Sequence, residues 1–248
     1  AILTSLRRGF YMKGKKKWID SLLLVFCVVI LGYSLFGLHG REYYFVSLAI
    51  ILSGVILFLI RFENRSPSVA EITIIAVMCA IAVVSRVSFF FLPQIKPIAA
   101  VVIITGISLG AEAGFMTGAV SAFVSNFSFG QGSWTPFQMF ALGLIGFFAG
   151  VVFQKIPVNK VTLSIYGMVS VVVLYGGIVD INTLFFSMGE NTGNSILAVY
   201  AQGLVFNVMF GISTVIFLVL IQTPLLSRLT RVKIKYNLME KEIDHEQS

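Results

Sequence analysis

The stretch IAAVVIITGISLGAEAGFMTGAVSAFVSNFSF, residues 98–129, decides the fold, because it is almost entirely apolar yet too long for one membrane-spanning helix. At about 1.5 Å per residue, a single helix over this run would be roughly 48 Å long, whereas a span needs about 20 residues. The two glycines of LGAEAG, residues 109–114, flank Glu112, the one acidic residue of the run. We therefore predict two helices, 97–109 and 112–129, that are separated at this point.

Composition places these helices in a membrane. Hydrophobic residues make up 57% of the 248 residues, charged residues make up 12%, and the mean hydropathy is +0.93. A soluble domain carries about 25% charged residues. The net charge of +7 would suit nucleic acid, but the Lys and Arg residues lie in short clusters between apolar segments. That distribution is typical of membrane proteins, so we predict a multi-pass protein of the cell membrane with no nucleic-acid partner.

Apolar segments of helical length recur along the chain. We predict helices at 18–38, 43–61, 69–92, 97–109, 112–129, 137–153, 161–187 and 196–222. With the N-terminus inside, every Lys and Arg other than Arg41, Arg86 and Lys96 falls on the cytoplasmic side. Because basic residues favour the cytoplasmic side, both termini are predicted to be cytoplasmic.

The segments group into four regions of an all-α integral membrane protein. The predicted regions are a basic cytoplasmic N-terminus (1–17), a two-helix transmembrane hairpin (18–64), a six-helix unit (68–222) and a charged cytoplasmic tail (223–248). Because MKGKKKW has the form of a translation start, residues 1–11 are given no structural role. The stretch 13–37 also has the charge and apolar pattern of a signal peptide; without a convincing A-x-A cleavage site, we favour an uncleaved helix.

Polar side chains gather at the outer ends of the predicted helices, where three loops, LPQIKP, FGQGSWTP and SMGENTGNS, also lie. The helix residues at this level are Arg86, Asn126, Gln138, Asp180, Asn182, Tyr200, Gln202 and Asn207. Ionisable groups at membrane depth usually face a cavity or a partner, so Arg86 and Asp180 are candidates for a pair across the bundle. The alternative is that Arg86 only extends to the headgroups and Asp180 neutralises it.

We predict an outward-facing solute site from this convergence. Its candidate residues are Arg86, Asn126, Gln131, Trp134, Gln138, Asp180, Tyr200 and Asn207. The two cysteines, Cys27 and Cys79, lack CxxC spacing, and no metal or cofactor site is predicted. There is no core histidine to serve as a general base, which argues against a membrane-embedded enzyme.

Small residues form stripes on three of the helices. The stripes are Gly114, Gly118 and Ala122; Met139, Gly143, Gly146 and Gly150; and Gly203 and Gly211, which share a face with Tyr200 and Asn207. Small side chains allow close helix approach in lipid, where packing must supply the association. We therefore predict tight packing of these helices.

The outer loop FGQGSWTP is predicted to act as a lid. Its glycines permit positive φ, Gln131 offers an amide and Trp134 a ring, while Thr135 and Pro136 suit the N-cap and first position of a helix. The alternative is an ordinary interfacial turn with Trp134 anchored at headgroup level.

Residues 68–222 resemble the substrate-binding S components of energy-coupling factor (ECF) transporters. The resemblance lies in AVMCA (76–80), in the passage KPIAAVVIITGISLGAEAGFMTGAVSAFVSNFSFGQGSWTPFQMFALGLIGFFAG (96–150) and in its outer loop GQGSWTPFQM. AVMCA has the family's A-x-x-x-A spacing, so the resemblance assigns Ala76 and Ala80 to the surface that meets a membrane coupling subunit.

The resemblance also implies a function. S components capture vitamins, close loops over them and topple in the membrane, while two separate ATPase subunits hydrolyse ATP. This chain has no GxxxxGK[ST] motif of its own and is not the motor. Two extra helices before the usual six are a departure from the family pattern.

The substrate is the least determined part of the prediction. Few ionisable groups among amides and aromatic rings suit a largely neutral molecule, or a large one held by many amide contacts. The resemblance, through its GQGSWTP passage, implies cobalamin as the substrate. The alternatives are another small heterocyclic vitamin or nucleobase-like solute, or a membrane scaffold that binds no solute.

Overall fold

The computed structural model describes residues 41–64, 67–187 and 192–236. The chain divides into two compact units, 1–54 and 55–248, and the helix α2, Arg41–Asn64, contains the boundary between them. The predicted N-terminal segment, the helix predicted at 18–38 and the last residues of the tail lie outside the described residues. The predicted hairpin is therefore represented by α2 alone.

Helices make up the described part of the second unit. They are α3 (Val69–Ser88), α4 (Ile98–Leu109), α5 (Ala111–Phe129), α6 (Thr135–Val152), α7 (Lys160–Val169), the π-helix η1 (Ser170–Tyr175), α8 (Gly176–Ser187) and α9 (Thr192–Lys235). No strand occurs among the described residues, and the predicted all-α class is confirmed. The largest differences in boundary are at the end of α3, which stops at Ser88 rather than at 92, and at the end of α9, which continues past residue 222 through Pro224 to Lys235. The helix predicted at 161–187 is divided into α7, η1 and α8.

Gly110 separates α4 from α5 where the sequence predicted a break. Its φ of 96° lies in the left-handed region, which glycine adopts without the steric cost of a Cβ. The Gly110 N–H still donates to the Gly106 carbonyl and the Gly114 N–H to the Gly110 carbonyl, both at 3.0 Å. The backbone thus changes direction without losing these hydrogen bonds.

Side-chain caps fix two other helix starts. The Ser68 hydroxyl accepts from the Glu71 N–H at 3.2 Å before α3. Before α7, the Asn159 side chain accepts from the Thr162 N–H at 2.9 Å, and the Thr162 hydroxyl accepts in return from the Asn159 N–H at 3.2 Å. This reciprocal capping box satisfies N–H groups that a helix start otherwise leaves unpaired.

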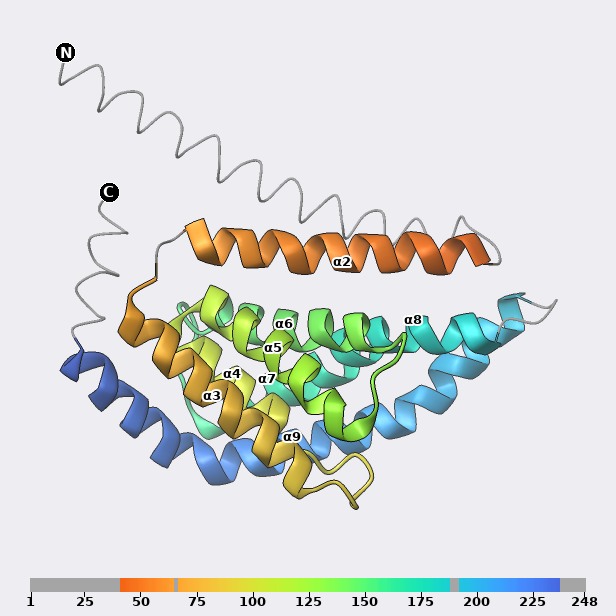
Figure 1. Ribbon diagram of the computed structural model, residues 1–248. Coiled ribbons are helices and arrows are strands. Elements are labelled where there is room, and N and C mark those ends of the chain that lie inside the picture. Colours follow the sequence, from red (N-terminus) through yellow and green to blue (C-terminus); the bar gives the residue numbers. More distant parts are fainter. Residues whose placement is uncertain (1–40, 65–66, 188–191, 237–248) are drawn as a thin grey trace, which may run out of the picture. The chain divides into compact units, whose positions relative to one another are not determined.

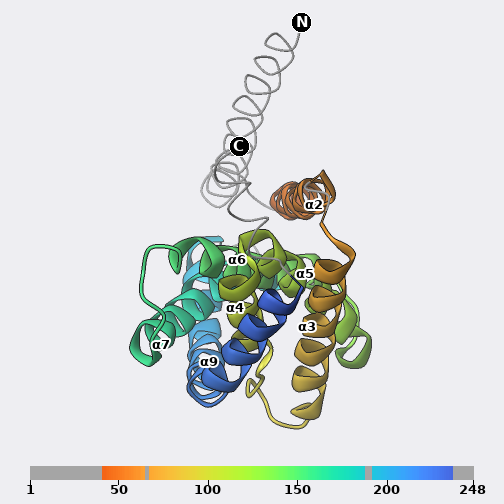
Figure 2. The same cartoon turned by 90° about the vertical axis from the view of Figure 1, so that its left-hand side faces the viewer.

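The short helix α4 is the centre of the bundle. All its residues except Ile107 and Ser108 are buried. It contacts α3, α5, α6, α7 and α9, which enclose it in the end-on view of Figure 2 and pack along it in Figure 1. A helix that is apolar on every side belongs in a core, and the other helices supply that core around α4.

Glycines bring α4, α5 and α6 into backbone contact, as the small-residue stripes predicted. A Cβ on Gly106 or Gly114 would overlap the carbonyl oxygen of Gly146, and one on Gly118 would overlap the carbonyl of Leu142. The three helices therefore approach more closely than any residue with a side chain would allow at these positions.

Gly146→Ala is expected to destabilise this packing by about 2–3 kcal/mol, because its methyl group would overlap the Gly114 carbonyl and lie 2.8 Å from Val102 Cγ1. Thermal unfolding in detergent measures the effect. Gly177→Ala is the matched control, since a Cβ there meets no atom within 4 Å. Equal melting temperatures for the two variants would show that the helices are not in backbone contact.

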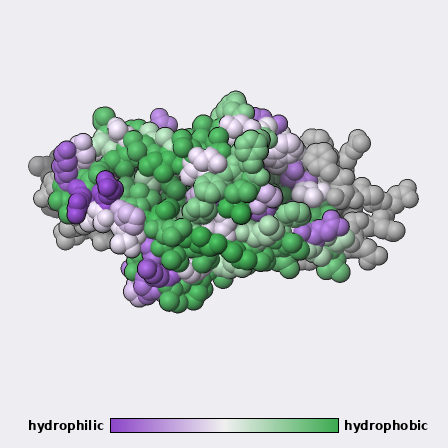
Figure 3. All heavy atoms as spheres, turned by 90° about the horizontal axis from the view of Figure 1, so that it is seen from below, coloured by the Kyte–Doolittle hydropathy of each residue, from purple (hydrophilic) through white to green (hydrophobic). Residues whose placement is uncertain are grey.

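Four of the described helical segments are long and apolar enough to cross a membrane: Val69–Ser88, Thr135–Val152, Lys160–Leu184 and Ile196–Lys235. Large apolar side chains remain exposed on them, including Val84 on α3 and Leu204, Val205, Ile212 and Leu220 on α9. Figure 3 shows one face of the molecule on which hydrophobic residues predominate. Such a surface suits lipid rather than water, and the prediction of a membrane protein is confirmed.

Candidate functional site

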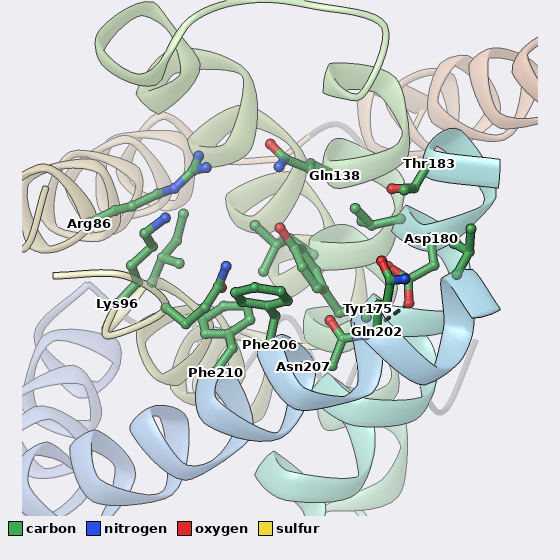
Figure 4. A pocket seen from close by; sticks show the side chains of 16 residues that line it. Arg86, Lys96, Gln138, Tyr175, Asp180, Thr183, Gln202, Phe206, Asn207 and Phe210 are labelled. Carbon is green, nitrogen blue, oxygen red and sulfur yellow. Dashed lines mark hydrogen bonds between the residues drawn. The ribbon is translucent and has the colours of Figure 1, made fainter. Parts of the chain in front are cut away.

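A cavity of about 310 Å³ opens between α3, α6, α8 and α9. It is lined by Arg86, Gln94, Lys96, Ile98, Gln138, Leu142, Tyr175, Val179, Asp180, Thr183, Val199, Gln202, Gly203, Phe206, Asn207 and Phe210. Figure 4 shows Arg86 and Lys96 on one side, Asp180 and Thr183 on the other, and the rings of Tyr175, Phe206 and Phe210 between them. The cavity thus has a cationic end, an aromatic middle and an acidic end.

Arg86 anchors the cationic end. It is only 5% exposed, and its Nη1 donates to the Ser125 hydroxyl and to Asn126 Oδ1, the latter at 2.9 Å. Its guanidinium also lies 4.5 Å from the ring centroid of Phe129, the last residue of α5. These three contacts hold a buried cation that would otherwise be costly in a membrane protein.

Lys96 lies beside Arg86, on the loop between α3 and α4. Its Nζ lies 4.6 Å from the centroid of the same Phe129 ring, and its backbone N–H donates to Ser213 Oγ of α9 at 2.9 Å. Burial, reinforced by the charge of Arg86, lowers the pKa of Lys96 to about 8. In the same loop Gln94 has φ 58°, a left-handed conformation that is uncommon for a residue with a side chain.

Asp180 and Asn207 form the opposite end. Asn207 Nδ2 donates to Asp180 Oδ2 at 3.0 Å, and both residues are buried. Each side chain lies over a glycine of the facing helix: a Cβ on Gly203 would overlap the Asp180 carboxyl, and one on Gly176 would overlap the Asn207 amide. The reciprocal glycines make room for this polar pair between α8 and α9.

The π-helix η1 sets the orientation of α8. A π turn holds one residue more than an α turn, so it rotates the following helix by roughly 100° relative to an uninterrupted α-helix. Leu163 of α7 is fully buried in the core, while Tyr175 and Asp180 farther along the same helical segment line the cavity. The π-helix η1 thus lies between the core residue Leu163 and the cavity-lining Asp180.

A hydrogen-bond network connects the cavity to the loop between α5 and α6. Asn126 Nδ2 donates to Gln138 Oε1 at 2.9 Å and to the Thr135 hydroxyl at 3.2 Å. That hydroxyl donates to Gln131 Oε1 at 2.9 Å, and Gln131 Nε2 donates to the Phe123 carbonyl at 2.9 Å. Arg86 and Gln138 in the cavity are therefore linked through Asn126 to the loop that the sequence assigned as a lid.

The predicted site residues separate into three groups. Arg86, Gln138, Asp180 and Asn207 line the cavity, and Asn126 lies behind Arg86 and Gln138. Gln131, Trp134 and Tyr200 do not line it.

These three residues have other contacts. Gln131 bonds to Thr135 and Phe123, and Trp134 is 38% exposed with its ring over Gly132. The Tyr200 hydroxyl donates to the Gly177 carbonyl at 3.0 Å, which joins α9 to α8.

Two sequence predictions about pairing and capping are wrong. Arg86 and Asp180 share the cavity but form no ion pair among the described residues, because each is held by a neutral partner, Asn126 and Asn207 respectively. Thr135 is the first residue of α6 rather than its N-cap; Trp134 occupies that position without a side-chain cap. The predicted positive φ is present at Gly130, at 95°.

Several lining residues were absent from the predicted set: Gln94, Lys96, Tyr175, Thr183, Gln202, Phe206 and Phe210. Lys96 and Gln202 carried a signal, since both are polar residues that the sequence places at the same predicted level as Arg86. Tyr175 carried none, because it lies in the π-helix η1, which a regular helical pattern does not predict.

The middle of α3 presents the two alanines of AVMCA on its surface. Ala76 and Ala80 are both exposed, as are the neighbouring Ile72, Val77 and Ile81. A small-residue, apolar face of this kind is available for another helix.

A comparison with protein families matched residues 66–231 to the family described as the S component of ECF-type riboflavin transporters. Comparisons with curated proteins and with solved structures gave no match. The matched segment contains α3 to α8, most of α9 and every residue that lines the cavity.

Proposed function

The chain belongs to the family of S components of ECF-type riboflavin transporters, and from this premise we propose that it captures a flavin, riboflavin itself, in the cavity between α3, α6, α8 and α9. The family is a class of transporter subunit and not of enzyme. The match supports the predicted S component but does not support cobalamin as its substrate.

The cavity's size supports a flavin over a corrinoid. A space of about 310 Å³, at the low end of the usual 300–1,000 Å³ for small-molecule pockets, suits a compact molecule. Riboflavin has about 27 non-hydrogen atoms and cobalamin roughly 90, so a corrinoid would require a much larger space at the packing density of proteins. Riboflavin also falls within the heterocyclic vitamins that the sequence left as an alternative.

The arrangement of polar and aromatic groups is the observation that carries the proposal. The tricyclic isoalloxazine ring is flat and apolar at one edge, which suits the space among Tyr175, Phe206 and Phe210. Its pyrimidinedione edge offers carbonyl acceptors that match the cations Arg86 and Lys96. The ribityl chain carries hydroxyls that suit the polar acidic end.

We further propose that delivery depends on partner subunits. Ala76 and Ala80 on the exposed face of α3 would dock a membrane coupling subunit. Because this chain has no nucleotide-binding motif, two separate ATPase subunits would hydrolyse ATP and supply the energy for transport. The basic clusters support cytoplasmic termini, with the cavity opening to the outside.

Quenching of flavin fluorescence tests the proposed substrate. The purified protein should bind riboflavin with a dissociation constant well below micromolar, and cobalamin should not compete. Tight cobalamin binding without flavin binding would overturn the proposal.

Riboflavin affinity is expected to fall about tenfold between pH 7 and pH 9. Lys96, with a pKa of about 8, is mostly protonated at pH 7 and mostly neutral at pH 9. Because a carbonyl acceptor favours the ammonium form, binding weakens as pH rises through this value. In Lys96→Gln the affinity should be lower and nearly constant over the same range. A wild-type affinity that does not change with pH would exclude Lys96 as a charged ligand-binding group.

A further inference from the structure

We propose that Asp180 is a specificity-determining residue that selects the free ribityl hydroxyl chain and rejects flavins that carry a terminal phosphate. The inference rests on the proposed function. It concerns which flavin the cavity accepts and names the residue that makes this selection.

Asp180 is held in a fixed position by its surroundings. Asn207 donates to Oδ2 at 3.0 Å, whereas Oδ1 has no hydrogen-bond partner among the described residues. The Asp180 carboxyl occupies the space beside Gly203, where the methyl group of an alanine would overlap it. One carboxyl oxygen is thus fixed by the protein and the other is available to accept hydrogen bonds from a ligand.

The charges of the cavity orient a flavin. Arg86 and Lys96 lie together on one side and Asp180 with Thr183 on the other (Figure 4). Carbonyl oxygens at the pyrimidinedione edge accept hydrogen bonds and therefore belong at the cationic end. The ribityl chain, whose hydroxyls also donate, then extends toward Asp180.

A phosphate at the end of that chain would meet the wrong charge. Arg86 and Lys96, the cations among the described lining residues, are already at the opposite end, while Asp180 and neutral groups form the end that the phosphate would reach. Bringing a phosphate dianion beside a carboxylate in a partly buried site is unfavourable. The cavity should therefore reject flavin mononucleotide by charge repulsion.

Titration with three flavins separates this proposal from the proposed function. Riboflavin, lumiflavin, which lacks the ribityl chain, and flavin mononucleotide are each titrated against the full-length wild type and against Asp180→Asn. The wild type should bind riboflavin at least about tenfold more tightly than either analogue. Because hydrogen bonds from the ribityl hydroxyls to a carboxylate become weaker bonds to a neutral amide oxygen, Asp180→Asn should reduce the preference over lumiflavin by about tenfold. It should also reduce the preference over flavin mononucleotide by at least tenfold.

Lys96→Gln is the matched control at the cationic end, and it should weaken riboflavin and lumiflavin by similar factors. Gly203→Ala provides a second test: its methyl group displaces the Asp180 carboxyl, so it should reduce the ribityl preference while Asp180 remains charged. Equal effects of Asp180→Asn on riboflavin and lumiflavin would overturn the inference, even with flavin binding intact. So would wild-type binding of flavin mononucleotide as tight as that of riboflavin. Absence of binding of all three flavins would instead overturn the proposed function, and the inference with it.

Discussion

Replacing both Ala76 and Ala80 with Trp is expected to reduce flavin uptake to background while flavin binding stays within about twofold of wild type. The two alanines are exposed near the middle of α3 and do not line the cavity. Indole rings there would prevent the close helix approach that small residues allow, because each would add a large rigid side chain between the two helices. Uptake by cells that express the complete transporter, together with binding to the purified variant, measures the separation.

Leu220→Trp is the matched control for this double substitution. Leu220 is 63% exposed on α9, so the control adds an indole to an apolar surface that we do not assign to the coupling subunit. It should leave both uptake and binding near wild type. Normal uptake by the Ala76→Trp, Ala80→Trp protein would show that the coupling subunit docks elsewhere.

Arg86→Met is expected to weaken riboflavin binding by at least 100-fold, equivalent to about 2.7 kcal/mol. The substitution removes the cation that faces the cavity and leaves Asn126 Oδ1 without its donor. It also removes the guanidinium from the ring of Phe129. Fluorescence titration gives the loss of affinity, and a melting curve in detergent shows whether the protein remains folded.

Arg86→Lys serves as the comparison for Arg86→Met. It keeps the charge but lacks the forked geometry that reaches Ser125 and Asn126 together. Its affinity should lie between those of the wild type and Arg86→Met. A folded Arg86→Met protein that binds riboflavin as tightly as the wild type would remove the cationic end from the site.

The helices were predictable from the sequence because their signals are local. Apolar length defined the segments, and the glycines around Glu112 indicated the break that φ 96° at Gly110 produces. The glycine stripes on α5 and α6 likewise predicted the backbone contact at Gly146. Each of these rules depends on residues close together in the chain.

The candidate site was predictable only in part, because its geometry depends on contacts between distant residues. Arg86 and Asp180, as ionisable residues in predicted helices, were candidates for a pair across the bundle. Instead, Arg86 is hydrogen-bonded to Asn126, and Asp180 is hydrogen-bonded to Asn207. Opposite charges in a sequence therefore did not reveal which neutral groups would hold them.

The π-helix η1 is the second reason why the predicted set of site residues differs from the residues that line the cavity. Helical periodicity assumes a constant rotation per residue, so it could not predict the π-helix η1, which contains the cavity-lining Tyr175. Loop residues presented a related difficulty, since Gln131 and Trp134 have side chains suited to ligands but are engaged by Thr135 and Gly132.

Mass spectrometry of the small molecules retained by the detergent-purified full-length protein tests flavin capture most directly. A high-affinity site commonly keeps its ligand through purification, so riboflavin should be present at near-stoichiometric amount and be largely lost from Arg86→Met. A retained corrinoid, or an empty protein that gains no thermal stability from added riboflavin, would contradict the proposal that the cavity captures a flavin.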